Sequence, residues 1–173
     1  VKAVSDYAAL CVEKPRLVRF ADLAVMAREE AGTLAEETKT PYTLRLDVQE
    51  GTLNTDPEAV RRIVRQLLRN SLEAFAEMPD ARATQGLRLT ITIGPHSEHE
   101  GGCRMLVQDN GPGILAKDLP FVFDPFFSTR PLGLGMGLCK AERLAKDLGG
   151  SLTIAPQEAS GSGCVVTLEI PHT

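Results

Sequence analysis

Two glycine-rich segments constrain this chain more than any other feature of its sequence. The first, "DNGPGI", covers residues 109–114, and the second, "GLGMGL", covers residues 133–138. Only the nineteen residues 114–132 separate their glycines. Glycine lacks a Cβ, so a segment rich in glycine lets another group approach the main chain closely. We therefore expect a bound molecule to lie against both segments.

Patterns beside these segments indicate what each one connects. Residues 103–109, "CRMLVQD", alternate as a strand does, which places Asp109 at the carboxyl end of that strand. A carboxylate there can accept a hydrogen bond from an exocyclic amine, as on adenine. Residues 137–149 predict a helix, and glycines at the start of a helix let backbone N–H groups converge on phosphate. Taken alone, each pattern also fits an ordinary turn or a loop before a helix.

The clearest helix covers about residues 57–78. Asp56 is a favourable N-cap, and Pro57 suits the first helical turn. Polar Gln66 and Asn70 share one face of this helix. Beside them runs an apolar stripe with helical spacing, made by Val60, Ile63, Val64, Leu67, Leu68, Leu72 and Phe75.

Periodicity elsewhere predicts a helix at 21–37 and strands at 42–48, 87–93, 151–155 and 164–170. Because helices and strands do not alternate strictly, a parallel fold is disfavoured. The alternating strands fit a sheet with one buried and one open face. We therefore predict an α+β fold, a two-layer α/β sandwich in which helices cover one face of a mixed, mostly antiparallel sheet.

Bulk composition excludes several classes of protein. At 173 residues, the chain has the size of one domain. Its net charge of −4 argues against nucleic acid as a partner, because phosphate contacts need clustered lysine and arginine. No apolar run approaches the ~20 residues of a membrane span, and no signal peptide is visible. The four cysteines show no metal-binding spacing, so we expect packing residues in the reducing cytoplasm.

The order of the motifs resembles one family. From Asn70 in its helix, the chain continues through "DNGPGI", "FVFDPFFSTR" (121–130), "GLGMGLCKAERLAKDLGG" (133–150) and "GSGCVVTLEIP" (161–171). Over about residues 40–171, this series resembles the Bergerat-type ATP-binding domain shared by sensor histidine kinases, Hsp90 chaperones, type II topoisomerases and MutL proteins. The segment "FDPFFST" is similar to the sensor histidine kinases in particular. The resemblance implies a catalytic domain that binds ATP with Mg²⁺ and transfers the γ-phosphoryl group to a histidine.

The resemblance assigns the base and the metal to the first motifs. Asp109 would hydrogen-bond the adenine amine. Gly111 and Gly113, which allow positive φ, would form the wall of the base pocket. Asn70 would hold Mg²⁺, for which an amide oxygen is a suitable ligand.

The phosphates and a lid are assigned to the second half of the motif series. The triphosphate would be wrapped by Gly133, Gly135, Gly137 and the N–H of Leu138. A short mobile lid would run from Phe126 through Phe127 to residue 132, and Arg130 would contact a phosphate. We expect most of the phenylalanines in residues 121–127 to pack at the base of this lid.

Three positions depart from the family's pattern. Gln66 stands where histidine kinases commonly have Asn and the ATP-hydrolysing relatives have Glu. An amide cannot take a proton from attacking water, so Gln66 argues against hydrolysis and for a transfer that rests on positioning. With Asn70 and Arg130, it completes the predicted catalytic set. Leu134 and Cys164 each replace a frequent Thr, which affects fine contacts and not the fold.

The acceptor histidine is not expected among the three histidines of this chain. His96 and His99 lie in a predicted turn and His172 near the end, and we expect all three to be solvated. The acceptor would then lie upstream, on a dimerisation domain. Residues 1–20 are similar to the end of that domain and its linker, and residues 21–173 to the catalytic domain.

Partners follow from the same resemblance. The parent protein would be a homodimer that carries the acceptor domain and passes the phosphoryl group to a response regulator, while this fragment is expected to be monomeric. Whether the parent is anchored in the inner membrane stays open. The opening segment and "RNSLEAF" (69–75) are similar to nitrogen-regulation sensor kinases.

Two other functions remain in view. A stand-alone anti-sigma-factor serine kinase has the same fold, but the helical residues 1–12 and the linker disfavour it. A non-catalytic ATP-sensing module is the second rival. The retained Asn70, Asp109 and three glycines disfavour that reading.

Overall fold

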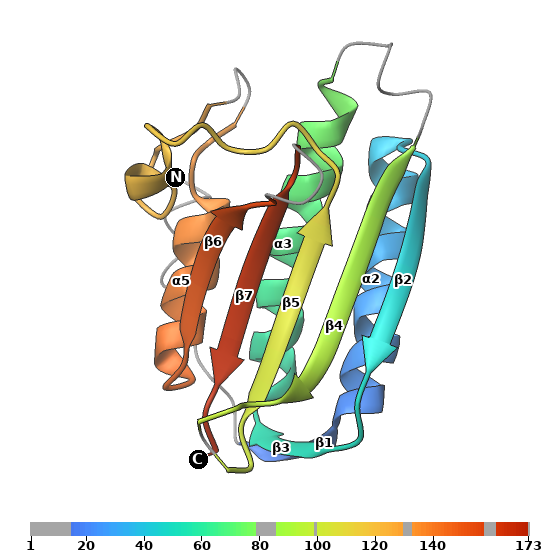
Figure 1. Cartoon of the computed structure of the whole chain (residues 1–173), viewed down its shortest axis with the longest axis vertical. Helices are drawn as coiled ribbons and strands as arrows, with labels where there is room; N and C mark the ends of the chain where they lie inside the picture. The colour runs from blue at the N-terminus through green and yellow to red at the C-terminus, as the bar shows by residue number, and fades with distance from the viewer. Residues whose placement is uncertain (1–14, 79–85, 99, 130–132, 158–161, 173) are drawn as a thin grey trace.

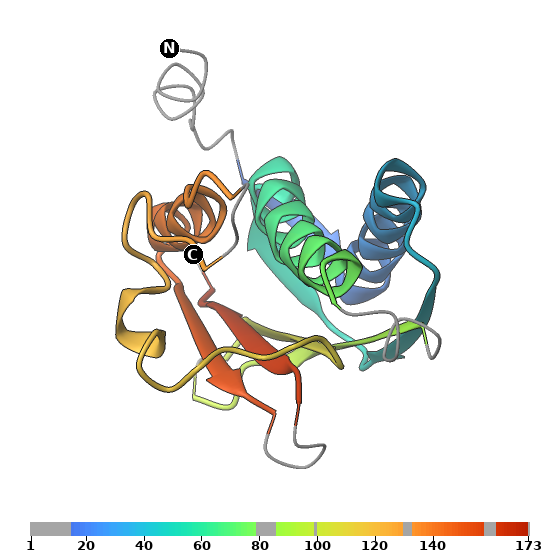
Figure 2. The same cartoon turned by 90° about the horizontal axis from the view of Figure 1, so that it is seen from above.

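The computed structural model describes residues 15–78, 86–98, 100–129, 133–157 and 162–172. Within them, a five-stranded sheet of order β2-β4-β5-β7-β6 forms one layer, and helices α2, α3 and α5 form the other (Figures 1 and 2). In chain order, these elements are α2 (Phe20–Thr38), β2 (Tyr42–Val48), α3 (Pro57–Ala76), β4 (Leu87–Pro95), β5 (Cys103–Asp109), α5 (Gly137–Asp147), β6 (Ser151–Pro156) and β7 (Cys164–Ile170). Only β2 and β4 pair in parallel. The predicted two-layer sandwich with a mixed, mostly antiparallel sheet is therefore confirmed.

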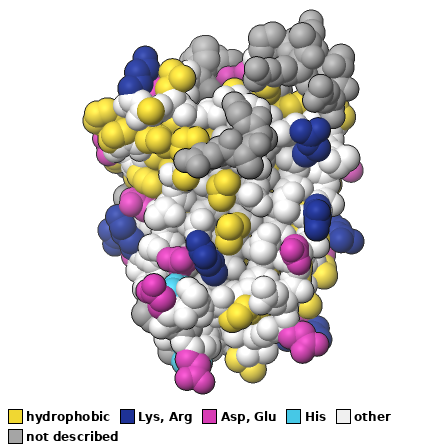
Figure 3. Space-filling model, viewed as in Figure 1, with side chains coloured by type: hydrophobic (Ala, Val, Ile, Leu, Met, Phe, Trp, Pro, Cys, Tyr) yellow, Lys and Arg dark blue, Asp and Glu magenta, His cyan; other side chains and the backbone are white. Residues whose placement is uncertain are grey.

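The pleat of the strands separates a buried face from an open one. In β5, Cys103, Met105 and Val107 face the helices and are each 1% exposed. The alternate residues of β5 lie on the other face, and β4 and β7 follow the same alternation. On the open face, hydrophobic side chains gather chiefly at one corner, over the segment between β5 and α5 (Figure 3). The hydrophobic core thus lies between the sheet and the three helices.

Helix α3 runs between α2 and α5 (Figure 2). It begins where predicted, because Asp56 Oδ1 accepts hydrogen bonds from the N–H groups of Glu58 (2.9 Å) and Ala59 (3.2 Å). Every member of its apolar stripe is buried. Gln66 and Asn70 lie on the side that faces the amino end of α5. The core packing of α3 therefore fixes where these two amides point.

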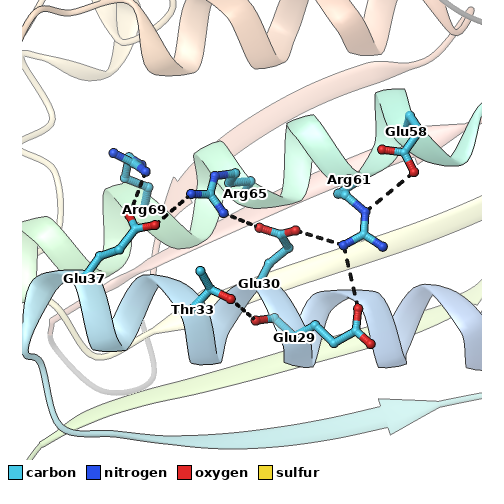
Figure 4. A network of polar contacts seen from close by, with 8 residues as sticks. All are labelled: Glu29, Glu30, Thr33, Glu37, Glu58, Arg61, Arg65 and Arg69. Atoms are coloured by element: carbon cyan, nitrogen blue, oxygen red, sulfur yellow. Dashed lines mark hydrogen bonds and ion pairs between the residues drawn. The ribbon is translucent and has the colours of Figure 1, made fainter.

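Ion pairs join α2 to α3 along their length (Figure 4). Glu30 on α2 accepts hydrogen bonds from Arg61 (2.9 Å) and Arg65 (2.6 Å) on α3. Glu37 lies further along α2 and accepts hydrogen bonds from Arg65 and Arg69, both at 3.0 Å. The two helices therefore present opposite charges to each other at the edge of an interface that also packs apolar side chains.

Two short strands are not predicted by the sequence pattern. β1 (Arg16–Arg19) and β3 (Thr52–Thr55) form a separate antiparallel pair at one end of the molecule. Four residues are too few to show a period of two, and sequence analysis places the first of these strands in a linker. The backbone N–H of Phe20 donates to the carbonyl oxygen of Gly51 at 3.0 Å, which ties the start of α2 to the turn before β3.

The division of the chain at residue 20 stays a prediction. The expected helix end, residues 1–12, lies outside the described residues. In the described part of the chain, no helix is long and apolar enough to cross a membrane. Cys103, Cys139 and Cys164 are free and buried, in agreement with their predicted packing role, and Cys11 lies outside the described residues.

The expectation that the histidines are solvated is wrong for His96. Its side chain is 7% exposed, its Nδ1 accepts a hydrogen bond from the N–H of Glu98 (3.0 Å), and its Nε2 lies 3.7 Å from Glu169 Oε2. The residue lies at the end of β4, where the turn folds back beside β7. His172 is exposed, and His99 lies outside the described residues.

Candidate functional site

A cavity of about 700 Å³ opens between α3, the carboxyl end of β5 and the amino end of α5. These two ends lie at the same end of the molecule (Figure 1). The volume suits a small-molecule ligand. Most of the predicted site residues line the cavity: Gln66, Asn70, Asp109, Gly113, Phe127, Gly133, Gly135, Gly137 and Leu138. Arg130 lies outside the described residues, and its role stays a prediction.

Asp109 forms the floor at one end of the cavity. It is the last residue of β5, and only 8% of it is exposed. Its Oδ1 accepts hydrogen bonds from the N–H groups of Gly111 (2.9 Å) and Cys164 (3.2 Å). Its Oδ2 accepts one from the hydroxyl of Ser71 on α3 (2.7 Å). The carboxylate is thus held by uncharged donors from three parts of the chain while it faces the cavity.

The two glycines of the first motif serve different purposes. Gly113 has a φ of +79°, as expected. Gly111, which was expected only to allow a positive φ, does not have one. A Cβ on Gly111 would lie 2.9 Å from Asp109 Oδ1, so its small size leaves room for the carboxylate of its own turn. A third glycine, Gly163, is required because its Cβ would lie only 1.9 Å from the carbonyl oxygen of Asp109.

The opposite end of the cavity is formed by the start of α5. Met136, the N-cap, makes no side-chain capping hydrogen bond. The first backbone N–H groups of a helix have no partner within the helix, and together with the helix dipole they favour an anion. A Cβ on Gly137 would lie 3.1 Å from Gln66 Oε1 and 3.6 Å from Asn70 Oδ1. Two amide oxygens of α3 and an uncapped helix start therefore converge on one place.

The glycine segment before α5 is folded against the phenylalanine segment. Gly135 (φ +66°) and Phe126 (φ +67°) both adopt left-handed backbone conformations. The N–H of Phe126 donates to the carbonyl oxygen of Gly135 (2.9 Å), and a Cβ on Gly135 would lie 2.4 Å from the carbonyl carbon of Phe126. The main chain at Phe126 thus lies against the main chain at Gly135 beside the cavity. This geometry suits the predicted lid, whose mobility stays a prediction.

Most of the phenylalanines were expected to pack at the base of this lid, and two of the four do not. Phe126 is 74% exposed, and Phe121, at the end of the short 3₁₀ helix η1 (Leu119–Phe121), is 49% exposed. Phe123 packs against the core, and Phe127 lines the cavity. The Phe121 ring lies 6.0 Å from the Phe127 ring, centroid to centroid. Hydrophobic periodicity cannot predict which of these side chains are buried, because residues 119–127 have no regular structure beyond η1.

Sequence reasoning missed two contacts that build the base end and one that holds the neighbouring strand. Ser71 directly follows Asn70, and its place next to the apolar stripe is the one signal that could have revealed it. Cys164 was noted for its side chain, whereas its backbone N–H makes the contact with Asp109. Burial and the nearby Asp109 raise the pKa of the Cys164 thiol to about 12, so it stays neutral.

Asn110 turns away from the cavity and binds the main chain of β4. Its Oδ1 accepts a hydrogen bond from the N–H of Arg88 (2.6 Å).

The two ends of the cavity differ in what they can bind. The Asp109 end offers a carboxylate acceptor beside flat backbone, which suits a planar group with an N–H donor. The α5 end offers N–H donors and amide oxygens, which suit an anion and its counter-cation. One ligand that spans the cavity would therefore be planar at one end and anionic at the other.

Comparison with known proteins agrees with this geometry. Residues 55–173 match the family described as "Histidine kinase-, DNA gyrase B-, and HSP90-like ATPase". The sensor histidine kinase ZraS of Escherichia coli strain K12 is 29% identical over 119 residues, which cover 69% of this chain and 23% of ZraS. The sensory histidine kinase/phosphatase NtrB of Rhizobium leguminosarum bv. phaseoli is 32% identical over 99 residues, which cover 54% of this chain and 26% of NtrB. The chain thus spans about a quarter of the length of these relatives.

The fold agrees as well. Full-length ShkA, solved in complex with AMPPNP, superposes with a TM-score of 0.73 at 20% identity, covering 98% of this chain and 34% of ShkA. The predicted likeness to the ATP-binding domain of sensor histidine kinases is confirmed. Because the family match covers well over half of its residues, this chain belongs to the histidine kinase-, DNA gyrase B- and HSP90-like ATPase family, and the relatives named here are sensor histidine kinases.

Proposed function

We propose that this chain is the catalytic domain of a sensor histidine kinase, which binds ATP with Mg²⁺ and delivers the γ-phosphoryl group to a histidine on a dimerisation domain of the parent protein. One observation carries the proposal. A buried carboxylate, Asp109, stands at one end of the cavity, and the uncapped start of α5 stands at the other beside two amide oxygens. Membership of an ATPase family and kinases among the relatives support the same function.

At the base end, Asp109 would accept a hydrogen bond from the exocyclic amine of adenine. Gly113 leaves the neighbouring wall without a side chain, so a flat ring can approach the backbone. Ile154 and Val166, which also line the cavity, add apolar surface beside the ring.

At the phosphate end, the N–H groups of Gly137 and Leu138 would donate to phosphate oxygens. Asn70 would hold the metal through its Oδ1, and the position of that atom beside Gly137 fits this role. Mg²⁺ takes few protein ligands and keeps several waters, so a single amide is sufficient. When bound, the metal neutralises charge on the phosphates.

The residue at position 66 bears on what receives the phosphoryl group. Gln66 Oε1 lies next to the start of α5, where a carboxylate could have activated water. An amide cannot do so, which favours transfer to an acceptor held in place over hydrolysis. We infer that the acceptor histidine and a response regulator follow in the phosphoryl path, in the cytoplasm. The nitrogen-regulation subfamily stays a prediction, to which NtrB lends partial support.

The purified chain, mixed with labelled ATP and a separately produced dimerisation domain, tests the function. Label should appear on the acceptor histidine, and Asn70→Ala should reduce that transfer about 100-fold. Affinity for ATP measured without Mg²⁺ should change little in this variant, because the base contacts remain. Arg62→Ala, an exposed change on the same helix, serves as the matched control.

Three outcomes would contradict the proposal in different ways. Normal transfer by Asn70→Ala would remove the metal role from that residue. Binding of ATP without any transfer would favour the ATP-sensing module. Phosphate release into solution without an acceptor would favour a hydrolase despite Gln66.

A further inference from the structure

The hydrogen bonds to Asp109 leave little of its carboxylate unoccupied. Two backbone N–H groups, from Gly111 and Cys164, fill the accepting positions of Oδ1. The hydroxyl of Ser71 fills one position of Oδ2 at 2.7 Å. Since an ionised carboxylate has about four accepting positions in all, one position on Oδ2 remains for a ligand.

Ser71 is placed so that its hydroxyl can control that last position. The residue is 7% exposed and lines the cavity. Its contact comes from α3, whereas the other two come from the turn after β5 and from the start of β7. Without Ser71, only Oδ1 is held, and the carboxylate plane is free to turn about the fixed oxygen.

The remaining position accepts a hydrogen bond and cannot donate one. A purine with an amino group at carbon 6 satisfies it, whereas a purine with hydrogen at that carbon leaves it empty. A purine with a carbonyl there sets two oxygens against each other. Discrimination among these rings therefore depends on how firmly Oδ2 is oriented.

We propose that Ser71 is a positioning residue that orients Asp109 Oδ2 toward the cavity and thereby makes the site select a 6-aminopurine nucleotide. This inference rests on the proposed function, since it concerns the same ligand. Ser71 immediately follows Asn70, so one turn of α3 serves both the base end and the phosphate end of the site.

Calorimetry with two nucleotides tests the role of Ser71. ATP and purine riboside triphosphate differ only in the 6-amino group, and the wild-type protein should prefer ATP. In Ser71→Ala, this preference should fall about tenfold, chiefly through weaker ATP binding, because one oriented hydrogen bond is worth about 1.4 kcal/mol. Ser71→Cys, whose thiol is a weak donor of similar size, should give an intermediate preference.

A matched control removes a buried hydroxyl elsewhere. Thr55 Oγ1 is buried and has no hydrogen-bond partner among the described residues, so Thr55→Val should leave the preference for ATP unchanged. Melting temperatures verify that each variant is folded. An equal loss of affinity for both nucleotides in Ser71→Ala, or an unchanged preference, would overturn the positioning role. Absence of ATP binding by the wild-type protein would instead overturn the proposed function.

Discussion

Two nearly buried carboxylates in this molecule, Glu30 and Asp109, are each 8% exposed, yet they have opposite surroundings. Glu30 lies between the guanidinium groups of Arg61 and Arg65, which compensate its negative charge (Figure 4). Asp109 receives only uncharged donors and borders a cavity. The difference teaches that burial alone does not mark a functional acid. Asp109 stands apart because it combines uncharged hydrogen-bond partners with a place in the lining of the cavity.

The pKa of Glu30 reflects this pairing. Burial alone would raise the pKa of Glu30, but the hydrogen bonds from Arg65 and Arg61 outweigh it and hold the pKa below its usual value. The same contacts raise the pKa of both arginines. The cluster is therefore fully charged at neutral pH and serves the α2–α3 interface.

The largest effect is expected from the loss of Asp109, the carboxylate that borders the cavity. Asp109→Ala removes the acceptor for the base, so affinity for ATP should fall about 100-fold or more. The melting temperature should also fall, because the carboxylate's hydrogen bonds to Ser71, Gly111 and Cys164 are lost, but the variant should remain folded. Calorimetry checks the first statement and thermal denaturation the second. Unchanged affinity would refute the adenine role of Asp109.

A smaller effect is expected on the structural side. Glu30→Ala leaves Arg61 and Arg65 without their central partner, although Glu58 and Glu37 remain in reach. We expect a loss of about 2 kcal/mol in the free energy of unfolding, measured by urea denaturation. Affinity for ATP should stay within about twofold of the wild-type value. Strong loss of ATP binding in this variant would show that the two carboxylates are not independent.

The smallest effect is expected in the pH dependence of the stability that Glu30 contributes. Because the folded-state pKa of Glu30 is lowered, its contribution to stability is present above the unfolded value of 4.5 and is lost as pH falls through the folded value. Glu30→Gln carries no such titration. The stability difference between wild type and this variant should therefore shrink as pH falls below the unfolded value of 4.5 and through the lower folded value. A difference that stays constant over this range would contradict the lowered pKa.

How far the sequence predicts this structure depends on the range of the interaction involved. Local patterns were sufficient for α3, whose Asp56 cap and apolar stripe are both observed. The position of Asp109 followed from the strand that it ends. The order of the motifs along the chain was sufficient to predict the family, because no single motif was specific enough alone.

Contacts between distant segments could not be predicted. Nothing in the pattern around Cys164 indicates that its N–H meets a carboxylate 55 positions earlier. The sequence indicated that Gly111 allows a positive φ, but not that the Asp109 side chain would leave no room for a Cβ at this position. The fate of Phe121 and Phe126 depends on a segment without a period, so their exposure had no local signal.

The place of β7 in the sheet has a consequence for the folding of this chain during synthesis. It is the last strand along the described chain, yet it lies between β5 and β6, and its first residue helps to hold Asp109. A nascent chain that has not yet emerged as far as β7 leaves one edge of β5 bare and lacks a wall of its binding site. Binding of a ligand at Asp109 therefore requires that β7 has already joined the sheet.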